Sequence, residues 1–357
     1  MSLQDIVNRP VSQWMRGVGP DRDVALGSRI RLARNLTRIP FPGVAGDEQA
    51  AEVVRRVRAA VEQSPELRHL NFVEISSLSP LDRHLLVERH LISPRHAQDV
   101  KHKAVVLRDD EVVSVMVNEE DHVRIQVLMP GLQLIAAWEL ADKVDDAFEQ
   151  HLPYAFHEER GYLTACPTNV GTGLRASVMV HLPALVSTDQ INRIIGAVGK
   201  FGLTVRGLYG EGTQALGNIF QFSNQVTLGH AEMDIIQHLI NVTRQVIDQE
   251  REARQTMLKR SKTLLEDRVN RAYGILAYAR VLSSQEALQH LSDVRLGIDL
   301  GLIDGLKPEI LQELLVAIRP AHLQKRVGRE LTPAERDVLR ATLIRERIAA
   351  ASKDGKQ

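Results

Sequence analysis

The stretch Cys166-Pro167-Thr168-Asn169-Val170-Gly171-Thr172-Gly173-Leu174-Arg175 opens the most informative part of this 357-residue chain. It contains the only cysteine, a glycine-rich turn and an arginine, and it leads directly into the apolar run 176–182. A short apolar run bounded by turn residues predicts a buried strand, so the thiol and the arginine are expected at the mouth of that strand. This local pattern alone is compatible with a functional site and with an ordinary buried cysteine.

Around this strand, the first part of the chain alternates between short apolar runs and helical patterns. The runs between tight turns predict strands at 104–107, 112–117, 123–129 and 176–182. Apolar residues at helical spacing predict helices at 133–150 and 188–199. Strands joined by hairpins, with helices between them, predict the α+β class with a mainly antiparallel sheet flanked by helices.

The strand pattern stops near residue 229, and amphipathic helical patterns follow it. They cover the segments 231–258, 264–281, 284–300, 307–318 and 333–350. We therefore expect an α+β domain at 1–258 and an all-α domain at 259–357. An amphipathic C-terminal half can also support self-association as a homo-oligomer.

Composition and charge exclude several classes of protein. Lys plus Arg and Asp plus Glu both number 45, so a formal net charge of +0 gives no argument for binding nucleic acid or an anionic membrane. The single cysteine excludes an internal disulfide and a cysteine-rich metal site. The chain lacks a signal-peptide pattern, and no run approaches the ~18 apolar residues of a membrane helix. We expect a cytoplasmic protein without a metal site built from side chains.

The spelling of the opening stretch resembles the active-site signature of the phosphagen (guanidino) kinases. These enzymes transfer the γ-phosphoryl group of ATP to a guanidinium nitrogen. Four further segments resemble motifs of that family in the same chain order, and they are 28–34 (SRIRLAR), 118–124 (NEEDHVR), 206–211 (RGLYGE) and 221–225 (QFSNQ). The resemblance spans residues 20–250 and implies the family's glutamine-synthetase-like fold, an antiparallel sheet flanked by helices.

The resemblance implies a set of nucleotide-binding residues. Its members are Ser28, Arg29, Ile30, Arg31, His90, Arg124, Arg175, Ala176, Ser177, Val178, Met179, Arg206, Gly207, Leu208, Tyr209 and Gly210. The sequence has no Walker-type P-loop, so arginines must hold the phosphates of ATP together with Mg²⁺. Arg29 and Arg31 are two residues apart, which places both on one face of a strand, where guanidinium groups can bind phosphate oxygens in pairs. Any one of these arginines could instead be a surface residue in an ion pair, and His90 could simply pack on a helix.

The resemblance assigns the chemistry on the acceptor to Glu120, Glu211 and Cys166. A protonated guanidinium is a poor nucleophile, and two carboxylates can orient its attacking nitrogen and accept a proton from it. Cys166 is expected to face the guanidinium as a thiolate, its pKa lowered by nearby positive charge, with a role in orientation. Without the resemblance, 119–121 would be interpreted as a solvated acidic turn. His122 is expected to be structural.

The chain departs from the small-molecule members of the family at both ends. Those enzymes carry a helical domain ahead of the first arginine motif, and it supplies a loop that closes over the acceptor. Here 27 residues precede Ser28, so we expect no such lid, while the helical segment 259–357 is added at the C-terminus. This layout resembles the bacterial protein-arginine kinase branch of the family, whose open site suits a guanidinium that projects from a protein.

A motif near the C-terminus agrees with that branch. Thr332 is placed to cap a helix, with Pro333 in its first turn and Glu335 as the capping-box partner. In that helix two arginines and one carboxylate lie three or four residues apart, which is a plausible clamp for phosphoarginine. The resemblance implies a phosphoarginine-binding motif formed by Arg336, Asp337, Arg340 and Ala341. The alternative is an exposed helix whose ion pairs have no ligand.

The resemblance implies ATP-dependent phosphorylation of arginine side chains in proteins, which would mark them for Clp-type degradation in a stress response. It also implies partners, namely protein substrates that present arginine, a zinc-finger activator protein, a heat-shock repressor, a Clp-type unfoldase and an opposing phosphatase. Two alternatives are kept. One is a kinase for a free guanidino compound, and the other is a phosphoarginine-reading adaptor without turnover.

Overall fold

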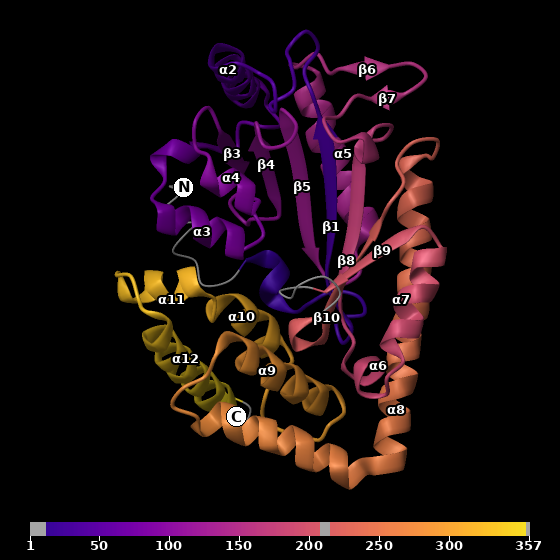
Figure 1. Ribbon diagram of the computed structural model, residues 1–357, viewed down its shortest axis with the longest axis vertical. Coiled ribbons are helices and arrows are strands. Elements are labelled where there is room, and N and C mark those ends of the chain that lie inside the picture. Colours follow the sequence, from indigo (N-terminus) through magenta and orange to yellow (C-terminus); the bar gives the residue numbers. More distant parts are fainter. Residues whose placement is uncertain (1–11, 208–214, 355–357) are drawn as a thin grey trace.

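The computed structural model describes residues 12–207 and 215–354, and their centre is a large antiparallel sheet (Figure 1). Within the described residues this sheet has eight strands in the order β2-β3-β4-β5-β1-β8-β10-β9, and every neighbouring pair is antiparallel. The strands are β1 (Ala25–Arg34), β2 (Asn71–Glu74), β3 (Ala104–Leu107), β4 (Val113–Val117), β5 (Val123–Pro130), β8 (Leu174–His181), β9 (Leu203–Gly207) and β10 (Ile219–Asn224). A separate hairpin pairs β6 (Phe156–His157) with β7 (Gly161–Tyr162). The predicted fold class is confirmed.

Strand β1 shows how the sequence assigns the two faces of the sheet. Its side chains alternate, so Ile30 and Leu32 are fully buried in the hydrophobic core while Arg29 and Arg31 lie on the opposite face. The helices that pack in the same core include α2 (Asp47–Gln63), α5 (Leu134–Glu149), α7 (Ile191–Lys200) and the first half of α8 (Glu232–Tyr278). Helices therefore cover one face, with α5 behind β1 in Figure 1, and the other face carries the arginines.

Short helical segments complete the first part of the chain. They are η1 (Gln13–Arg16), η2 (Ile75–Ser77), α3 (Pro80–Glu88), α4 (Pro94–Gln98), η3 (Pro167–Asn169), α6 (Pro183–Ser187) and η4 (Leu216–Asn218). Ser79 and Ser93 cap α3 and α4 by accepting backbone N–H bonds, and a proline follows each cap. The second strand of the sheet, β2, is also present although the sequence patterns did not predict it.

The C-terminal part is helical, as predicted. The expected helices at 231–258 and 264–281 are the two halves of α8, which spans 47 residues and is broken at Ser261 by a non-helical backbone conformation (φ −146°, ψ 46°). No proline or glycine occurs between Ala231 and Tyr273, so the two halves join at a kink without a loop between them. The break lies close to the expected domain boundary, which remains a prediction.

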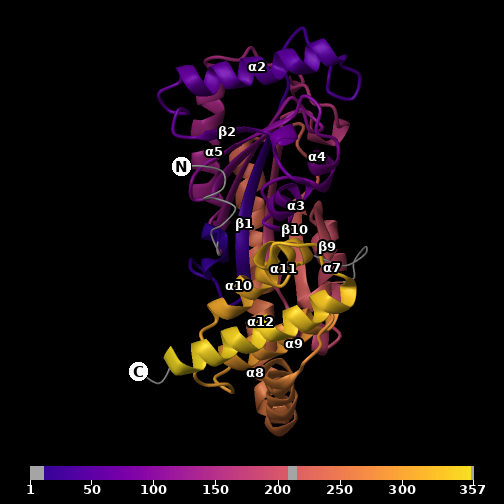
Figure 2. The same ribbon diagram turned by 90° about the vertical axis from the view of Figure 1, so that its left-hand side faces the viewer.

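The remaining helices are α9 (Ser284–Asp299), α10 (Glu309–Ala317), α11 (Pro320–Val327) and α12 (Pro333–Asp354). Figure 2 shows α12 at the end of the molecule opposite α2. Helix α11 was not predicted, because eight residues are too few to give a clear helical period. Within the described residues, no helix is long and apolar enough to cross a membrane.

A second hydrophobic core joins the helical part to the sheet. It combines the leucines of α8 to α12 with side chains from the first part of the chain, which are Trp14, Met15, Leu26, Leu128, Met179 and Ile219. A buried polar network runs beside it, in which Arg254 donates to Glu250 (2.7 Å), to Asp299 (3.2 Å) and to the carbonyl of Asp23 (3.2 Å). The two parts therefore share one continuous interior.

His122 is buried in the structural role predicted for it. Its Nδ1 accepts the backbone N–H of Leu36 (3.0 Å) and its Nε2 donates to the carbonyl of Pro40 (3.0 Å), an arrangement that fits only the neutral ring. Burial lowers the pKa of His122 from 6.5 to about 4.

Acid is therefore expected to destabilise the protein through His122. Between pH 6.5 and 4 the unfolded chain takes up the proton and the folded protein does not, so the free energy of unfolding falls as the pH is lowered. At pH 5 this residue alone should account for roughly 2 kcal/mol. Urea unfolding at pH 7 and pH 5 should show a smaller pH dependence in His122→Gln than in the exposed control His84→Gln. An equal pH dependence in both variants would contradict this assignment.

Candidate active site

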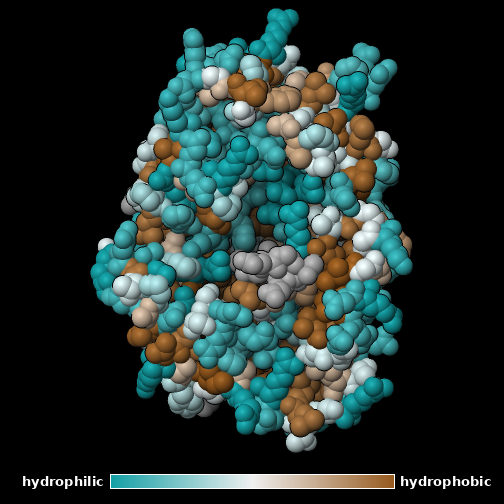
Figure 3. Space-filling model, in the orientation of Figure 1, coloured by the Kyte–Doolittle hydropathy of each residue, from teal (hydrophilic) through white to brown (hydrophobic). Residues whose placement is uncertain are grey.

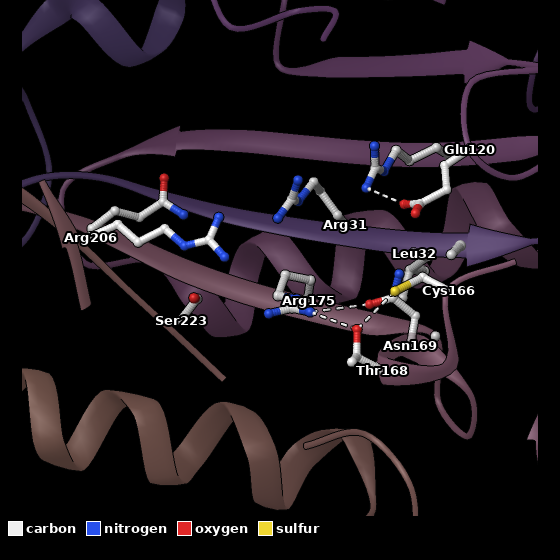
Figure 4. A pocket seen from close by; sticks show the side chains of 13 residues that line it. Arg31, Leu32, Glu120, Cys166, Thr168, Asn169, Arg175, Arg206 and Ser223 are labelled. Atoms are coloured by element: carbon white, nitrogen blue, oxygen red, sulfur yellow. Dashed lines mark hydrogen bonds and ion pairs between the residues drawn. The ribbon is translucent and has the colours of Figure 1, made fainter. Parts of the chain in front are cut away.

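The face of the sheet opposite the helices, called here the arginine face, brings together side chains from five strands. The strand register places Arg31 directly opposite Arg175, Arg29 opposite Ser177, and Arg206 opposite Gln221. Around Arg31 the sheet forms a cavity of about 190 Å³ (Figure 4). The residues that line it are Arg31, Leu32, Ala33, Glu120, Arg124, Cys166, Thr168, Asn169, Gly173, Arg175, Arg206, Gln221 and Ser223.

The arginine face carries an excess of positive charge at its centre, where no carboxylate of the described residues forms an ion pair with Arg31. Arg31 makes no hydrogen bond or ion pair with any residue that the structure describes, and its Nε is buried. Burial, and then the charges of Arg29, Arg124 and Arg175, hold the pKa of Arg31 well below its usual value. Burial and Arg124 likewise lower the pKa of Arg29 to about 10. Like charges directly opposite each other destabilise a sheet, so the site is built for an anion with several charges.

Two neighbouring glutamates, Glu119 and Glu120, make different contacts at one wall of the cavity. Glu119 is buried, accepts from Ser93 Oγ (2.7 Å), and forms an ion pair with Arg124. Glu120 lines the cavity with a side chain that is 33% exposed, and its carboxylate lies 3.5 Å from the second Arg124 nitrogen. Glu119 therefore fixes the arginine, while the Glu120 carboxylate is left open to a ligand in the cavity.

The Cys166 segment forms the wall beside Glu120. The sulfur lies 3.0 Å from Thr168 Oγ1, and Arg175 donates to Asn169 Oδ1 (3.3 Å) and to the carbonyl of Asn224 (3.0 Å). Figure 4 shows the thiol between the Glu120 carboxylate and Arg175. The arrangement places a thiol, a carboxylate and several guanidinium groups around one small space, and the thiolate state of Cys166 remains a prediction.

The same segment is anchored from behind by buried polar groups. Asp121 is fully buried and accepts a hydrogen bond from the backbone N–H of Ala165 (2.7 Å). The hydroxyl of Thr227 donates to this segment, where the carbonyl oxygens of Thr168 (3.0 Å) and Val170 (2.7 Å) both lie within hydrogen-bond distance. Gly171 has φ +111°, and a Cβ there would lie 2.5 Å from the carbonyl oxygen of Thr227. Only glycine fits this approach. Asp121 thus ties the loop of Glu120 to the loop of Cys166.

Arg34 supports this anchor from within the protein. It is 2% exposed, donates to Asp145 Oδ2 through Nε (2.9 Å) and Nη2 (2.6 Å), and donates to the carbonyl of Thr172 (3.0 Å). Its guanidinium carbon lies 3.5 Å from the centre of the Tyr162 ring. The pair therefore holds the glycine-rich turn against β1.

Removing the partner of Arg34 is expected to be costly. Asp145→Ala leaves a buried guanidinium without its carboxylate, which should lower the free energy of unfolding by about 3–5 kcal/mol. Urea unfolding of Asp145→Ala and of the adjacent, exposed control Asp146→Ala measures the difference. A loss below about 1 kcal/mol, the range of surface pairs, would mean that water reaches Arg34 in solution.

Most of the predicted site residues reach the arginine face. Arg31, Arg124, Arg175, Arg206, Glu120 and Cys166 line the cavity, and Arg29, Ser177 and Met179 lie on the same face of the sheet. Gly207 ends β9 next to Arg206. Leu208, Tyr209, Gly210 and Glu211 lie outside the described residues, so their roles stay predictions.

Four of the predicted nucleotide-binding residues turn their side chains away from the arginine face because of strand alternation, so their contact with a nucleotide stays a prediction. Ile30, Ala176 and Val178 are fully buried in the helix-covered core. Ser28 is also fully buried, where its hydroxyl donates to the carbonyl of Gly131 (2.8 Å) and accepts the N–H of Gln133 (2.9 Å). Ser28 thus fixes the turn before α5, and the other three could reach a ligand only through backbone atoms.

His90 follows α3 in a left-handed conformation (φ +63°), so it is not part of the helix, and its role at the nucleotide stays a prediction beside the alternative that it only packs. Its ring contacts Trp14 at 5.3 Å between centroids. Burial, and then the charges of Arg29 and Arg319, lower the pKa of His90 to about 3. The neutral ring lies near Arg29, at the end of the arginine face away from Cys166.

The predicted phosphoarginine motif lies in α12, and its capping box is confirmed. Thr332 Oγ1 accepts from the N–H of Glu335 (3.3 Å), whose carboxylate accepts from the N–H of Thr332 (2.8 Å). Arg336 and Asp337 are partly exposed, but Arg340 is 2% exposed and Ala341 is fully buried. Arg340 pairs with Asp337 and donates to the carbonyls of Leu282 (2.8 Å) and Ile318 (3.1 Å). In this conformation the expected clamp is closed.

The geometry of the arginine face can be compared with known proteins. Residues 52–253 match the family described as ATP:guanido phosphotransferase, C-terminal catalytic domain, and residues 262–357 match the family described as Protein-arginine kinase McsB C-terminal domain. The chain belongs to the protein-arginine kinase branch of the ATP:guanido phosphotransferase family. It is therefore a kinase of a family that uses ATP.

Relatives of this family resemble the chain over nearly its whole length. A protein-arginine kinase of Brevibacillus brevis is 56% identical over 350 residues, which are 98% of each chain. A protein-arginine kinase of Halothermothrix orenii is 54% identical over 348 residues, 98% of this chain and 99% of the other. The crystal structure of lombricine kinase superposes with a TM-score of 0.58 at 26% identity, covering 66% of this chain and 68% of that one.

Several residues that shape the site in this guanidino phosphotransferase were not predicted. They are Glu119, Asp121, Thr168, Asn169, Gln221 and Ser223. All six lie inside the segments that carry the family resemblance. Gln221 and Ser223 are two residues apart in the segment 221–225, so the period of two of a strand could have placed both on one face.

Proposed function

We propose that the protein phosphorylates arginine side chains of proteins, converting ATP and a protein arginine into ADP and a protein phosphoarginine. The observation that carries this proposal is the cavity in which Arg31, Arg124 and Arg175 face the Glu120 carboxylate and the Cys166 thiol. Figure 3 shows a hollow lined largely by hydrophilic residues at the centre of this side of the molecule. The names of the relatives at 56% and 54% identity support a protein as the acceptor.

The residues of the cavity suit each part of that transfer. A guanidinium nitrogen of the acceptor attacks the γ-phosphorus, the bond from phosphorus to the β,γ-bridging oxygen breaks, and its electron pair leaves with ADP. Glu120 would orient the nitrogen and accept its proton. The arginines would stabilise the negative charge of the transferred group, and Cys166 would lie against the guanidinium.

Magnesium would enter the site together with ATP. Among the described residues there is no group of three or more His, Cys, Asp or Glu side chains that could hold a metal ion. Such a site suits an ion held by the phosphates of ATP and water, with at most one or two carboxylates such as Glu119 or Glu120 nearby. The bound ion would neutralise part of the phosphate charge.

The motif in α12 would bind the product. Arg336 is partly exposed and makes one described hydrogen bond, to the carbonyl of Leu331 (2.7 Å), so it can exchange this carbonyl for a phosphate. Arg340 would have to exchange its carbonyl partners in the same way, because its guanidinium is buried. A phosphoarginine that supplies both a phosphate and a guanidinium could replace the Asp337–Arg340 pair.

The cellular role is proposed from the family resemblance. Phosphoarginine would mark proteins for a Clp-type unfoldase in a cytoplasmic stress response, with a zinc-finger activator protein and a heat-shock repressor as further partners. A free guanidino compound is the second candidate acceptor, and the superposition on lombricine kinase favours it.

The acceptor is tested by measuring phosphoryl transfer from ATP to a chemically unfolded model protein and, separately, to free L-arginine. We expect acid-labile phosphate on arginines of the protein and little formation of phosphorylated free arginine. Efficient turnover of free arginine with none on the protein would favour the small-molecule kinase. Binding of a phosphoarginine peptide without transfer to either acceptor would favour an adaptor.

A further inference from the structure

Large apolar side chains are exposed directly behind the Cys166 segment. Phe201 follows α7, Val226 and Leu228 lie in the connection from β10 to α8, and Met233 lies in the first turn of α8. Their exposed fractions are 55%, 49%, 53% and 45%. Isolated exposed apolar residues are ordinary, but four on adjoining segments are typical of a binding surface. Figure 3 shows hydrophobic residues along the right-hand side of the central hollow.

These segments enclose a groove of about 350 Å³, called here the apolar groove. Its walls include Phe201, Leu203, Val226 and Ile235, and its polar edge includes Asp234 and His238. His238 Nε2 contacts the carbonyl of Phe201 at 2.8 Å, which ties α8 to the end of α7. The groove therefore lies between the residues that follow α7, the connection from β10 to α8, and the first turns of α8.

The apolar groove is continuous with the wall of the catalytic cavity. Asn224 lines the groove, while its carbonyl accepts from Arg175, which lines the cavity. Thr227, between the exposed Val226 and Leu228, is buried and donates into the Cys166 segment. A Cβ on Gly171 would lie 2.8 Å from the Cα of Leu228, so the Cys166 segment and the connection from β10 to α8 are in contact.

We propose that the apolar groove binds an apolar side chain of the protein acceptor, carried a few residues away from the arginine that enters the catalytic cavity. The proposal rests on the proposed function, since a free guanidino compound is too short to occupy both places. An extended chain advances about 3.3 Å per residue, so an apolar residue near the arginine in the acceptor sequence can reach a groove that adjoins the wall of the cavity. The carboxylate of Asp234 at the groove, with Glu232 in the same first turn of α8, complements the positive charge of an arginine-bearing segment.

The occupant is an unfolded segment because both parts of the acceptor must be available at once. In folded proteins apolar side chains are mostly buried while arginines are exposed. A chain that offers both within a few residues, in extended form, has left its native fold. The groove thus selects acceptors by their apolar side chains, while the arginine face would bind the phosphates of ATP.

Two peptides with a single central arginine test the proposal, one with Leu and Val on both sides of the arginine and one with Ser and Gly in those positions. The variant is Phe201→Ser/Val226→Ser, which removes apolar surface without adding charge. The matched control is Val44→Ser/Val327→Ser, whose side chains are 79% and 44% exposed elsewhere. We expect the wild type and the control to favour the apolar peptide, and the groove variant to raise its KM roughly tenfold with kcat unchanged. The KM of the polar peptide should stay within about twofold.

Equal kcat/KM of the wild type on the two peptides would overturn the groove while leaving the arginine kinase intact. A groove variant that raises KM equally for both peptides would do the same, since that result reports damage to the catalytic cavity. A change in sedimentation of the groove variant with unchanged KM would assign the surface to a second copy of the chain, against the proposal. Phosphorylation of free arginine and of neither peptide would overturn the proposed function and the groove with it.

Discussion

Replacing Glu120 by glutamine is expected to lower kcat for phosphoryl transfer roughly a thousandfold while ATP still binds. The glutamine keeps the size of the side chain and its place 3.5 Å from Arg124, but an amide cannot take a proton from the guanidinium. General-base catalysis contributes about 10²–10⁴-fold, and correct orientation of the nitrogen adds to it. The loss should therefore appear in kcat, with KM for ATP changed only slightly.

The measurement is single-turnover transfer to an arginine-bearing protein, with Glu62→Gln as control. Glu62 is exposed on α2, away from the arginine face, so its substitution should leave the rate unchanged. ATP binding by calorimetry separates the chemical step from a loss of nucleotide. A Glu120→Gln rate within tenfold of wild type would assign the base to another group, for which Glu211 is the remaining candidate.

Replacing Arg31 by glutamine is expected to reduce activity and stabilise the nucleotide-free protein. An arginine that holds transition-state charge is worth about 10³-fold or more in phosphoryl transfer, so kcat/KM should fall by at least that factor. In the absence of ATP, however, Arg31 has no hydrogen-bond or ion-pair partner among the described residues and lies opposite Arg175. Relief of this unpaired, partly buried charge should raise the free energy of unfolding by about 1–2 kcal/mol.

Thermal and urea unfolding with and without ATP test both halves of this expectation. Wild type should gain stability on addition of ATP, and Arg31→Gln should start higher and gain less. The control is Arg193→Gln on the exposed side of α7, where neither stability nor rate should change. A destabilised Arg31→Gln protein would show that this guanidinium has a protein partner in solution, and the charge excess described for the arginine face would then be wrong.

The sequence was most informative in the segments that match the ordered motifs of a known family. Motifs on separate strands predicted that Arg31, Arg124, Arg175 and Cys166 would meet, and the antiparallel register brings them to one cavity. The family motifs did not indicate which face of the sheet each side chain occupies, because they take no account of strand alternation. Ser28 stands next to Arg29 in the sequence, but it points to the opposite face and bonds the turn before α5.

Other features depended on tertiary contacts that have no local signal. Arg340 looks like an exposed member of a helical clamp, yet the carbonyls that bury it come from Leu282 and Ile318, far away in the sequence. Arg34 gave no sign of its role, because Asp145 and Tyr162 approach it only in the folded sheet. Such pairs follow from how elements pack, which a single sequence does not reveal.

The hydrophobic interior shared by the two parts determines how the protein is expected to behave when it is truncated. A truncated product that ends at residue 258 would keep every strand of the sheet and the whole arginine face. It would also uncover Trp14, Leu26 and Met179, which are at most 7% exposed in the full chain because α8 to α12 cover them. Such a fragment is expected to precipitate on expression even though its active site is complete.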